Sequence, residues 1–424
     1  MMNEFELQFG RQKSARARRL KEAVVACFHA SPAEVAARFQ SYSEADWREI
    51  LFWLDISGMA LYLLDQVRAE GIERCLPPLL RNRLQLNLEQ NRLRTAQMLC
   101  HADDVGSAFR RHGIDFALIK GITLASDSVP EPALRWQTDL DFLISGRDAD
   151  TATTVLEELG YEPHATSGGT IEFRSGLMGK PDLANLYRPG TQRSLELHCL
   201  RRTDREQDRL ARARSKSFPG GIELPALSSA DILVQQALHL LKHLCGEHTR
   251  LSWVLEFWRH IRVRQNDRQF WGEVKAIAAT EPKADLALSI SVWLATSLFG
   301  KVSHGAIEIW GADGIPDGVK LWLRRYSREL LLSDSIATKL YLILRRQLPR
   351  EGNSKGTARL ILPLCLPAKI TQSAPGETLA ARLSRYRIEG NYSLRRLRFH
   401  LCEGIRYGVE ALRWELVVPR VQRP

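Results

Sequence analysis

The residues of this chain best suited to chemistry are two aspartates, Asp139 and Asp141, in the run RWQTDLDFLI at residues 135–144. One leucine separates them, so in a strand both carboxylates point to one face and the apolar residues of the run to the other. Carboxylates this close repel each other unless a cation or a proton lies between them. Mg²⁺ prefers a few carboxylates together with the phosphate oxygens of a substrate. The pair is therefore a candidate site for a metal ion that carries a phosphorylated substrate.

Three nearby residues fit the same ligand. The apolar run at 115–119 ends at Lys120 and Gly121, where the glycine lets the backbone approach a phosphate at the start of a helix. Lys120 would meet that phosphate as a point charge. Arg135, four residues before Asp139, could pair with phosphate as well. The alternatives are that Lys120 caps the end of a strand and that Arg135 only balances the aspartates.

A third carboxylate, Glu196, lies in the run SLELHC, where it shares a strand face with Ser194 and His198. If this strand neighbours the aspartate strand, the acids complete a two-metal site for phosphoryl or nucleotidyl transfer. One ion would activate a hydroxyl and the other would stabilise a triphosphate. The alternative for Glu196 is a carboxylate on a surface strand. His198 would donate to a phosphate or orient Glu196, or else it is a hydrogen-bonded structural residue.

Two further histidines, His239 and His243, lie on successive turns of an expected helix. Histidines at this spacing can bind zinc, but neither an HExxH motif nor a pair of CxxC motifs accompanies them. Packing of the helix near the catalytic cleft is the favoured interpretation.

The segments that must position these residues change character along the chain. Apolar residues recur every three or four positions over 12–104 and again from Ser228 to about residue 347, which predicts helices. Ser43 and Asp46 have the spacing of an N-terminal cap. Between the helical parts we expect strands at DFALI, LDFLI, TIEFRS, ANLYR and SLELHCL, and a helix that stops at Gly160. This order predicts an α+β protein whose small mixed sheet is flanked by N- and C-terminal helical domains.

The changes of pattern divide the chain into four expected segments. They are an N-terminal helical region, 1–105; a mixed core with the acids, 106–205; a C-terminal helical domain, 206–347; and a Pro/Gly-rich linker with a basic tail, 348–424. The tail interleaves tyrosines, Phe399 and Trp414 with arginines. This pattern fits a nucleic-acid surface and fits equally an amphipathic helix docked on the body.

Composition narrows the class of protein. The 424 residues are 44% hydrophobic and 26% charged, which is typical of a globular protein. No apolar run reaches the length of a membrane span, and the N-terminus lacks a signal-peptide core. The seven cysteines are scattered singly, which fits reduced thiols, so we expect a cytoplasmic location. The net charge of +11 favours phosphorylated or polyanionic partners, nucleic acid among them.

The ordered set FALIKGITLA…LRWQTDLDFLIS…LEELGY…LELHCL…ALHLLKH…RLSWVLEFW resembles a bacterial nucleotidyltransferase family usually labelled uncharacterised, a branch of the DNA polymerase beta-like superfamily. The resemblance covers roughly residues 85 to 265. An Asp-x-Asp pair alone is common by chance, whereas the ordered set is much more specific. The matching positions are Lys120, Gly121, Arg135, Asp139, Asp141, Gly160, Tyr161, Glu196, His198, His239 and Trp253.

This resemblance implies a polymerase beta-like nucleotidyltransferase core. Asp139, Asp141 and Glu196 would bind Mg²⁺, or Mn²⁺ in its place, and Lys120 and Gly121 would lie on the phosphates of an NTP such as ATP. The implied reaction moves a nucleoside monophosphate from the NTP to a hydroxyl and releases pyrophosphate. The acceptor stays open between a small molecule, a peptide or protein side chain, and an RNA.

Three features depart from the wider superfamily. Lys-Gly stands where Gly-Ser is usual, and the interval from Gly121 to Asp139 is longer than usual. Glu196 stands where aspartate is commoner, a change that a Mg²⁺ site should tolerate.

Other functions stay open beside this one. A toxin-like enzyme that modifies tRNA or protein would arrest growth only when its aspartates are intact. A catalytically inert nucleic-acid-binding protein that retains the fold would bind RNA or DNA without them. A scaffold built on the helical flanks would leave the acidic strand face unexplained.

Overall fold

The structure, a computed structural model, describes residues 15–167, 169–176, 186–190, 193–200, 209–300, 302, 308–334, 338–349 and 378–421. The chain forms two compact units. The larger unit comprises Lys13–Lys242 and Arg250–Gly314, and the smaller comprises Met1–Gln12, His243–Thr249 and Ile315–Pro424. The sheet and the three candidate acids lie in the larger unit.

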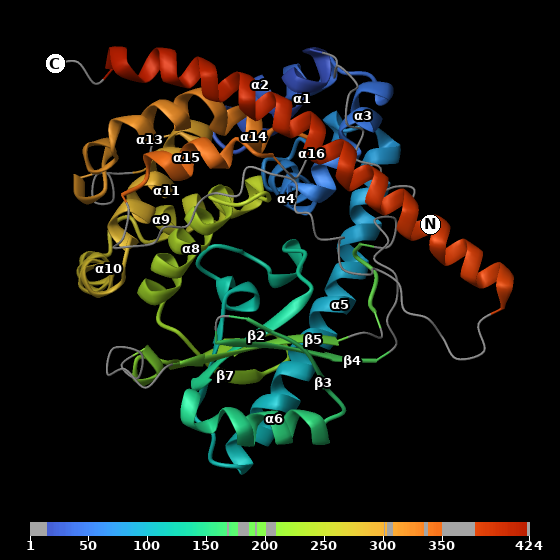
Figure 1. The fold of residues 1–424 in the computed structure, drawn as a ribbon, viewed down its shortest axis with the longest axis vertical. Coiled ribbons are helices and arrows are strands. Elements are labelled where there is room, and N and C mark those ends of the chain that lie inside the picture. The colour runs from blue at the N-terminus through green and yellow to red at the C-terminus, as the bar shows by residue number, and fades with distance from the viewer. Residues whose placement is uncertain are drawn as a thin grey trace. The chain divides into compact units, whose positions relative to one another are not determined.

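One mixed sheet of seven strands forms the centre of the larger unit (Figure 1). The strands lie in the order β3-β4-β5-β2-β1-β7-β6. β2 runs parallel to β5 and β1 runs parallel to β7, whereas the other neighbours are antiparallel. The strands are β1 (Phe116–Ile119), β2 (Asp139–Ser145), β3 (Glu162–Ser167), β4 (Thr170–Ser175), β5 (Arg193–Leu200), β6 (Arg214–Phe218) and β7 (Ile222–Ala226).

Two helices, α5 (Pro78–Arg111) and α6 (Ala149–Glu158), cover one face of this sheet. The apolar side of β2 packs beneath them, and the ring centroid of its buried Phe142 lies 5.7 Å from that of Phe109 on α5. Because alternate residues of a strand face opposite ways, the two aspartates of β2 lie on the other face. The predicted division of this strand into an apolar and an acidic side is therefore confirmed.

The rest of the larger unit is mainly helical, as the apolar periodicity predicts. The expected cap is confirmed, because the Ser43 hydroxyl accepts a hydrogen bond from the backbone N–H of Asp46 at the start of α3. Among the described residues, no single helix is both long and apolar enough to cross a membrane; the bent pair α3 and α4 passes only when joined. The helices are α1 (Ala15–Ala26), α2 (Pro32–Gln40), α3 (Glu44–Ile56), α4 (Ala60–Ala69), α8 (Ser229–Leu244), α9 (Leu251–Val263), α10 (Arg268–Thr280) and α11 (Ala284–Phe299).

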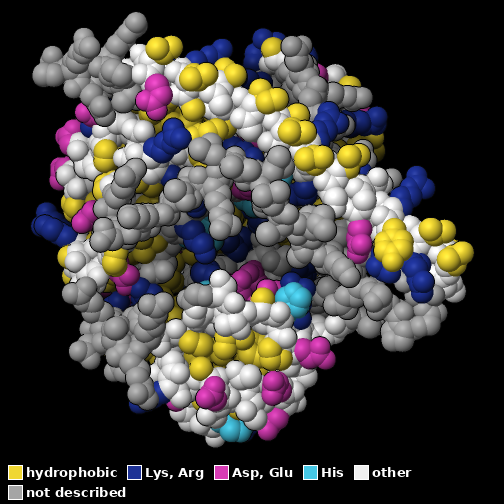
Figure 2. Space-filling model, in the orientation of Figure 1, with side chains coloured by type: hydrophobic (Ala, Val, Ile, Leu, Met, Phe, Trp, Pro, Cys, Tyr) yellow, Lys and Arg dark blue, Asp and Glu magenta, His cyan; other side chains and the backbone are white. Residues whose placement is uncertain are grey.

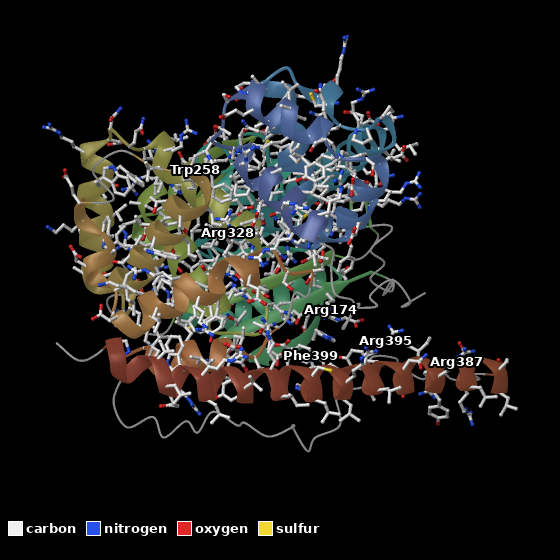
Figure 3. All side chains as sticks on the ribbon, turned by 90° about the horizontal axis from the view of Figure 1, so that it is seen from above. Arg174, Trp258, Arg328, Arg387, Arg395 and Phe399 are labelled. Carbon is white, nitrogen blue, oxygen red and sulfur yellow. The ribbon has the colours of Figure 1, made fainter. Side chains whose placement is uncertain are left out.

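In the smaller unit, short helices pack against one long helix. The tail forms α16 (Leu379–Val421), a helix of 43 residues in which Phe399, Tyr407 and Trp414 are buried. Hydrophobic side chains also follow the path of α16 across the face seen in Figure 2, and side chains project from its outer side in Figure 3. The tail is thus an amphipathic helix docked on its own unit, one of the two interpretations that the sequence left open. The short helices are α13 (Asp317–Trp322), α14 (Arg328–Leu331) and α15 (Tyr341–Gln347).

The sheet extends further along the chain than expected. β6 and β7 form an antiparallel hairpin over 214–226, past the expected end of the core at residue 205. Neither this hairpin nor β3 was predicted. β3 and β6 are edge strands and every residue of β3 is exposed, whereas β7 is an interior strand of only five residues. An exposed edge strand can lack the alternation of apolar and polar residues by which a strand is predicted from sequence. The division into four segments stays a prediction, and the expected linker falls almost wholly on 350–377, outside the described residues.

One expected strand, ANLYR at 184–188, is wrong where it is described, since residues 186–188 form a turn. The carbonyl of Leu186 accepts hydrogen bonds from Nε1 of Trp136 at 2.7 Å and from Nη1 of Arg94 at 3.3 Å. These side chains satisfy the acceptor that a strand ladder would otherwise use. Residues 184–185 lie outside the described part of the chain.

The close approach of α5 to the sheet gives a test of this packing. A Cβ at Gly106 would lie 2.8 Å from Cδ2 of Leu224 and 2.9 Å from Cζ of Phe116. We expect Gly106→Ala to lower the free energy of unfolding by about 1–3 kcal/mol in urea titrations, because the methyl overpacks the core. Gly272→Ala is the control: nothing lies within 4 Å of its Cβ, so it should stabilise α10 by about 0.5–1 kcal/mol. Equal effects of both substitutions would contradict the packing described.

Candidate active site

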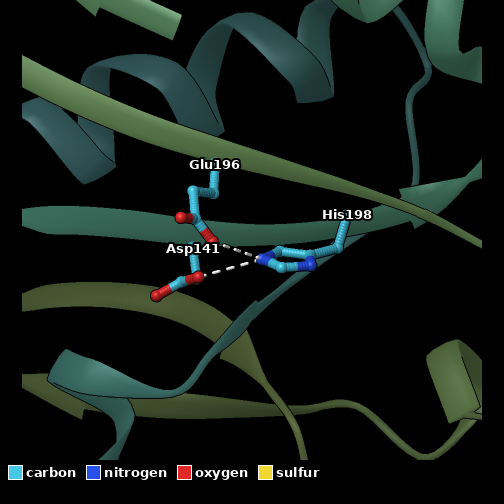
Figure 4. Close-up of side chains that lie close together, drawn as sticks. All are labelled: Asp141, Glu196 and His198. Carbon is cyan, nitrogen blue, oxygen red and sulfur yellow. Dashed lines mark hydrogen bonds and ion pairs between the residues drawn. The ribbon is translucent and has the colours of Figure 1, made fainter. Parts of the chain in front are cut away.

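The pairing of β2 with β5 brings the acidic residues together. In the parallel register Asp141 lies opposite Glu196, and Leu143 lies opposite His198. Nε2 of His198 lies 2.9 Å from Oδ1 of Asp141 and 3.2 Å from Oε2 of Glu196 (Figure 4). One ligand atom from each of these three side chains lies within 4.8 Å of the others, so together they could hold a metal ion.

Lys120 lies among these same atoms. It follows the end of β1, whose Ile119 is the partner of Asp141. Its Nζ lies 2.6 Å from Oδ1 of Asp141 and 3.2 Å from both Oε2 of Glu196 and Nε2 of His198. The ammonium thus supplies the positive charge that the adjacent carboxylates require. Burial lowers the pKa of Lys120, but the two carboxylates outweigh burial and leave it raised.

The charges in this cluster depend on one another. The hydrogen bond from His198, and then the charge of Lys120, hold the pKa of Glu196 well below its usual range despite burial. Burial lowers the pKa of His198, but hydrogen bonds to Asp141 and Glu196 outweigh it and leave this pKa raised. On its other side, Nδ1 of His198 lies 3.1 Å from Oγ1 of Thr170, which fixes the ring on β5. The arrangement favours ionised carboxylates bound by cations.

Asp139 lies on the same face of β2 but is not one of the three grouped ligands. Burial raises its pKa, and the negative charges of Asp141 and Glu196 raise it further. Its Oδ1 accepts a hydrogen bond from Oγ1 of Thr138 at 3.3 Å. The raised pKa means that Lys120 does not compensate this third carboxylate fully. A divalent cation bound by the acids would compensate it, and carboxylate donors fit Mg²⁺ or Mn²⁺.

Arg135 contacts another acid, Glu256 on α9. Its Nε lies 3.2 Å from Oε1 of Glu256, and its Nη1 donates to Oε1 of Gln137 at 3.1 Å. Glu256 is only 2% exposed and also accepts a hydrogen bond from the hydroxyl of Tyr62 at 2.8 Å. Burial lowers the pKa of Arg135, but Glu256 outweighs burial and leaves it raised. Arg135 therefore belongs to a buried ion pair that ties the strand entrance to α9 and α4.

Position 121 requires glycine, because the side chain of Gln137 lies against its backbone. Its φ is +29°, and a Cβ there would lie 2.6 Å from Oε1 of Gln137 and 3.7 Å from Nη1 of Arg135. The segment that follows Lys120 is a short 3₁₀ turn, Gly121–Leu124, rather than a longer helix. The expected phosphate contact of Gly121 stays a prediction.

Two arginines near the acids were not singled out from the sequence. Burial lowers the pKa of Arg94 on α5, and burial together with Arg135 lowers the pKa of Arg250 to about 10. The guanidinium of Arg250 lies 4.6 Å from the ring centroid of Trp136 and 5.5 Å from that of Trp253. The negative charge of Asp139 acts on both arginines. Partly desolvated cations of this kind are suited to an anionic ligand.

The other two histidines singled out from the sequence, His239 and His243, lie outside this cluster. The ring of His239 packs on Trp253 with centroids 4.7 Å apart, and Nδ1 of His243 lies 3.1 Å from the carbonyl oxygen of His248. In the described part of the chain, neither is part of a group that could hold a metal ion. Helix packing accounts for His239, in agreement with the favoured interpretation.

Comparison with known proteins identifies the class. Residues 43–300 match the model of a family described as uncharacterised nucleotidyltransferase, and the chain belongs to that family. No curated protein matches the chain. Among solved structures, it is similar to an antigenic nucleotidyltransferase-like protein from Paracoccidioides brasiliensis, at 15% sequence identity and a TM-score of 0.29. That likeness covers 49% of this chain and 95% of the other.

The buried pair of Arg135 and Glu256 can be tested through its energetics. We expect Glu256→Leu to lower the free energy of unfolding by about 3–5 kcal/mol, because it leaves the Arg135 guanidinium buried without its carboxylate. The double variant Arg135→Met/Glu256→Leu should lose less than the single variant, since no uncompensated charge is left. Urea denaturation of these two variants and of Arg135→Met alone measures this. A double variant that loses the sum of two single losses would contradict the pairing.

Proposed function

We propose that this protein transfers a nucleoside monophosphate from a metal-bound NTP to a hydroxyl and releases pyrophosphate. The observation that supports this most directly is the parallel pairing that puts Asp141 beside Glu196 on the face that also carries Asp139. Adjacent carboxylates on one strand face suit a divalent cation with a triphosphate. Membership of a nucleotidyltransferase family supports the same reaction class.

In this proposal the three carboxylates, Asp139, Asp141 and Glu196, hold Mg²⁺ or Mn²⁺. In a two-metal mechanism, one ion would lower the pKa of the acceptor hydroxyl and the other would polarise the reacting phosphate. His198 keeps Asp141 and Glu196 turned toward each other, since its Nε2 hydrogen-bonds both. Thr170 orients the imidazole from behind.

The basic residues bind the phosphates. Lys120 is a compact charge on a flexible stem, so its ammonium can move from the carboxylates to the triphosphate when a metal ion takes its place. Arg250 would pair with an outer phosphate oxygen, whereas Arg94 already donates to three backbone carbonyls. Arg135 has a positioning role, because its ion pair with Glu256 fixes the start of β2. The acceptor is a hydroxyl of a small molecule, a peptide or protein, or an RNA.

Nucleotide binding tests the acidic site. We expect calorimetry with each of the four NTPs and Mg²⁺ or Mn²⁺ to identify at least one that binds, and Asp139→Asn/Asp141→Asn to weaken that binding by about 100-fold or more. Both substitutions keep the side-chain size but remove the charges that hold the metal. The control is Glu223→Gln, which removes one exposed carboxylate of β7 outside the cluster. If no NTP binds with either metal, or if both variants bind like the wild type, the proposed site is wrong.

Lys120 gives a second test, because its two proposed roles predict opposite signs. Lys120→Met should raise the affinity for Mn²⁺ alone, measured by electron paramagnetic resonance, since the ammonium no longer competes for Asp141 and Glu196. The same variant should weaken metal-dependent NTP binding by about tenfold, the loss of one charge-assisted hydrogen bond. A variant in which both affinities fall would mean that Lys120 only shapes the site.

A further inference from the structure

The outer side of α16 carries an apolar stripe that repeats every eleven residues. Leu383, Leu394, Ile405 and Leu416 follow one another at this interval, and Leu401 and Leu412 repeat it. Eleven residues make slightly more than three full turns of an α-helix, so residues at this spacing lie nearly in a straight line along it. The six side chains, which we call the apolar stripe, therefore extend along most of a helix that is about 65 Å long.

The apolar stripe is exposed to an unusual degree. Its six side chains are between 50% and 72% exposed, and Figure 2 shows hydrophobic groups in a line along α16. Isolated exposed leucines are normal on a protein surface, but a continuous apolar band marks an interaction site. In the described part of the chain, α5 bears a shorter line of three exposed leucines, Leu79, Leu86 and Leu93, whereas the apolar stripe of α16 has six members.

The opposite side of α16 explains why this band is not simply the docking face. Phe399, Tyr407 and Trp414 lie on that other side and are buried, with Trp414 packed 6.1 Å from the ring centroid of Tyr326. Glu403 there accepts hydrogen bonds from the hydroxyl of Thr338 and the backbone N–H of Lys339. The helix thus already has one packed face, and the apolar stripe is a second one.

The charges of α16 indicate which partner the stripe fits. Its sequence contains nine arginines and four glutamates, a balance of +5. Arg387 and Arg398 are exposed, repeat the eleven-residue interval, and each follows a stripe leucine by four residues, so both adjoin the stripe. Glu403 and Glu410 are engaged on the packed side, where Glu410 accepts a hydrogen bond from the hydroxyl of Tyr326. Glu415, beside the stripe, is an exposed acid, so the exposed side is apolar and mainly rather than wholly basic.

We propose that α16 binds the surface of an anionic lipid bilayer, with the apolar stripe buried at the headgroup boundary and the adjoining arginines on the acidic headgroups. Leucine and isoleucine beside arginines on one straight helix face are the features of a helix that lies in the plane of such an interface. A second copy of the chain would bring two faces of like charge together, which is unfavourable. Single-stranded nucleic acid is bound by aromatic stacking, and nucleic-acid phosphates need no apolar contact, whereas the stripe is aliphatic.

Vesicle binding by the full chain tests this proposal. We expect the protein to sediment with vesicles of phosphatidylcholine and phosphatidylserine, and at least tenfold less with phosphatidylcholine alone. Leu394→Glu/Ile405→Glu should abolish sedimentation, because acidic side chains replace the apolar contact. Arg387→Glu/Arg398→Glu should weaken it by about tenfold or more while the apolar contact remains.

The matched control places the same change on another helix. Leu86→Glu/Leu93→Glu replaces two exposed leucines of α5, 52% and 61% exposed, and should leave vesicle binding unchanged. Circular dichroism confirms that each variant folds. Failure of the wild type to bind anionic vesicles, or equal loss in the α5 variant, overturns the proposal. So does a dimer in analytical ultracentrifugation that only the stripe variant dissociates, since a second copy would then cover the stripe. None of these results depends on nucleotide binding.

Discussion

The repulsion between neighbouring carboxylates is the constraint on which the rest of the site depends. Parallel pairing of β2 with β5 brings Asp141 and Glu196 to the same height on one face, and Asp139 adds a third charge nearby. Burial makes this repulsion stronger, because the local dielectric is low. Lys120 compensates these negative charges. It follows the end of the neighbouring strand β1, and its ammonium contacts both Asp141 and Glu196.

The same constraint explains why the surroundings are rigid. The other face of β2 packs under α5 and α6, so the strand cannot rotate to move its carboxylates apart. The bond from Arg135 to Glu256 fixes the entrance of β2 to α9, and Tyr62 adds a hydrogen bond from α4. Elements far apart in the sequence are thereby joined behind the acids. Lys120 faces the acids and its side chain is 34% exposed, against 16% for Arg135, so Lys120 is the cation that a ligand can reach.

The sequence predicts strand faces well because alternation is local: it places Asp139 and Asp141 opposite the apolar side of β2, as the structure has them. It does not predict contacts between distant segments. Arg135 and Glu256 are 121 residues apart, and no local pattern links them. Lys120 is expected at a strand end, but its position among the acids depends on a backbone φ of +54°, which side-chain type does not reveal. The edge strands escape notice for the opposite reason, since they bury little.

The choice of lysine at position 120 connects the charge balance of the site to ligand exchange. An arginine there would bind the carboxylates through two parallel hydrogen bonds and would be hard to displace. A lysine makes point contacts from a flexible stem, and burial opposes its charge even while Asp141 and Glu196 favour it. The ammonium can therefore compensate the acids in the free protein and still leave them when stronger charges arrive. When a metal ion displaces the Lys120 ammonium from the acids, a nearby phosphate would be its new partner. Every buried charge would then stay compensated.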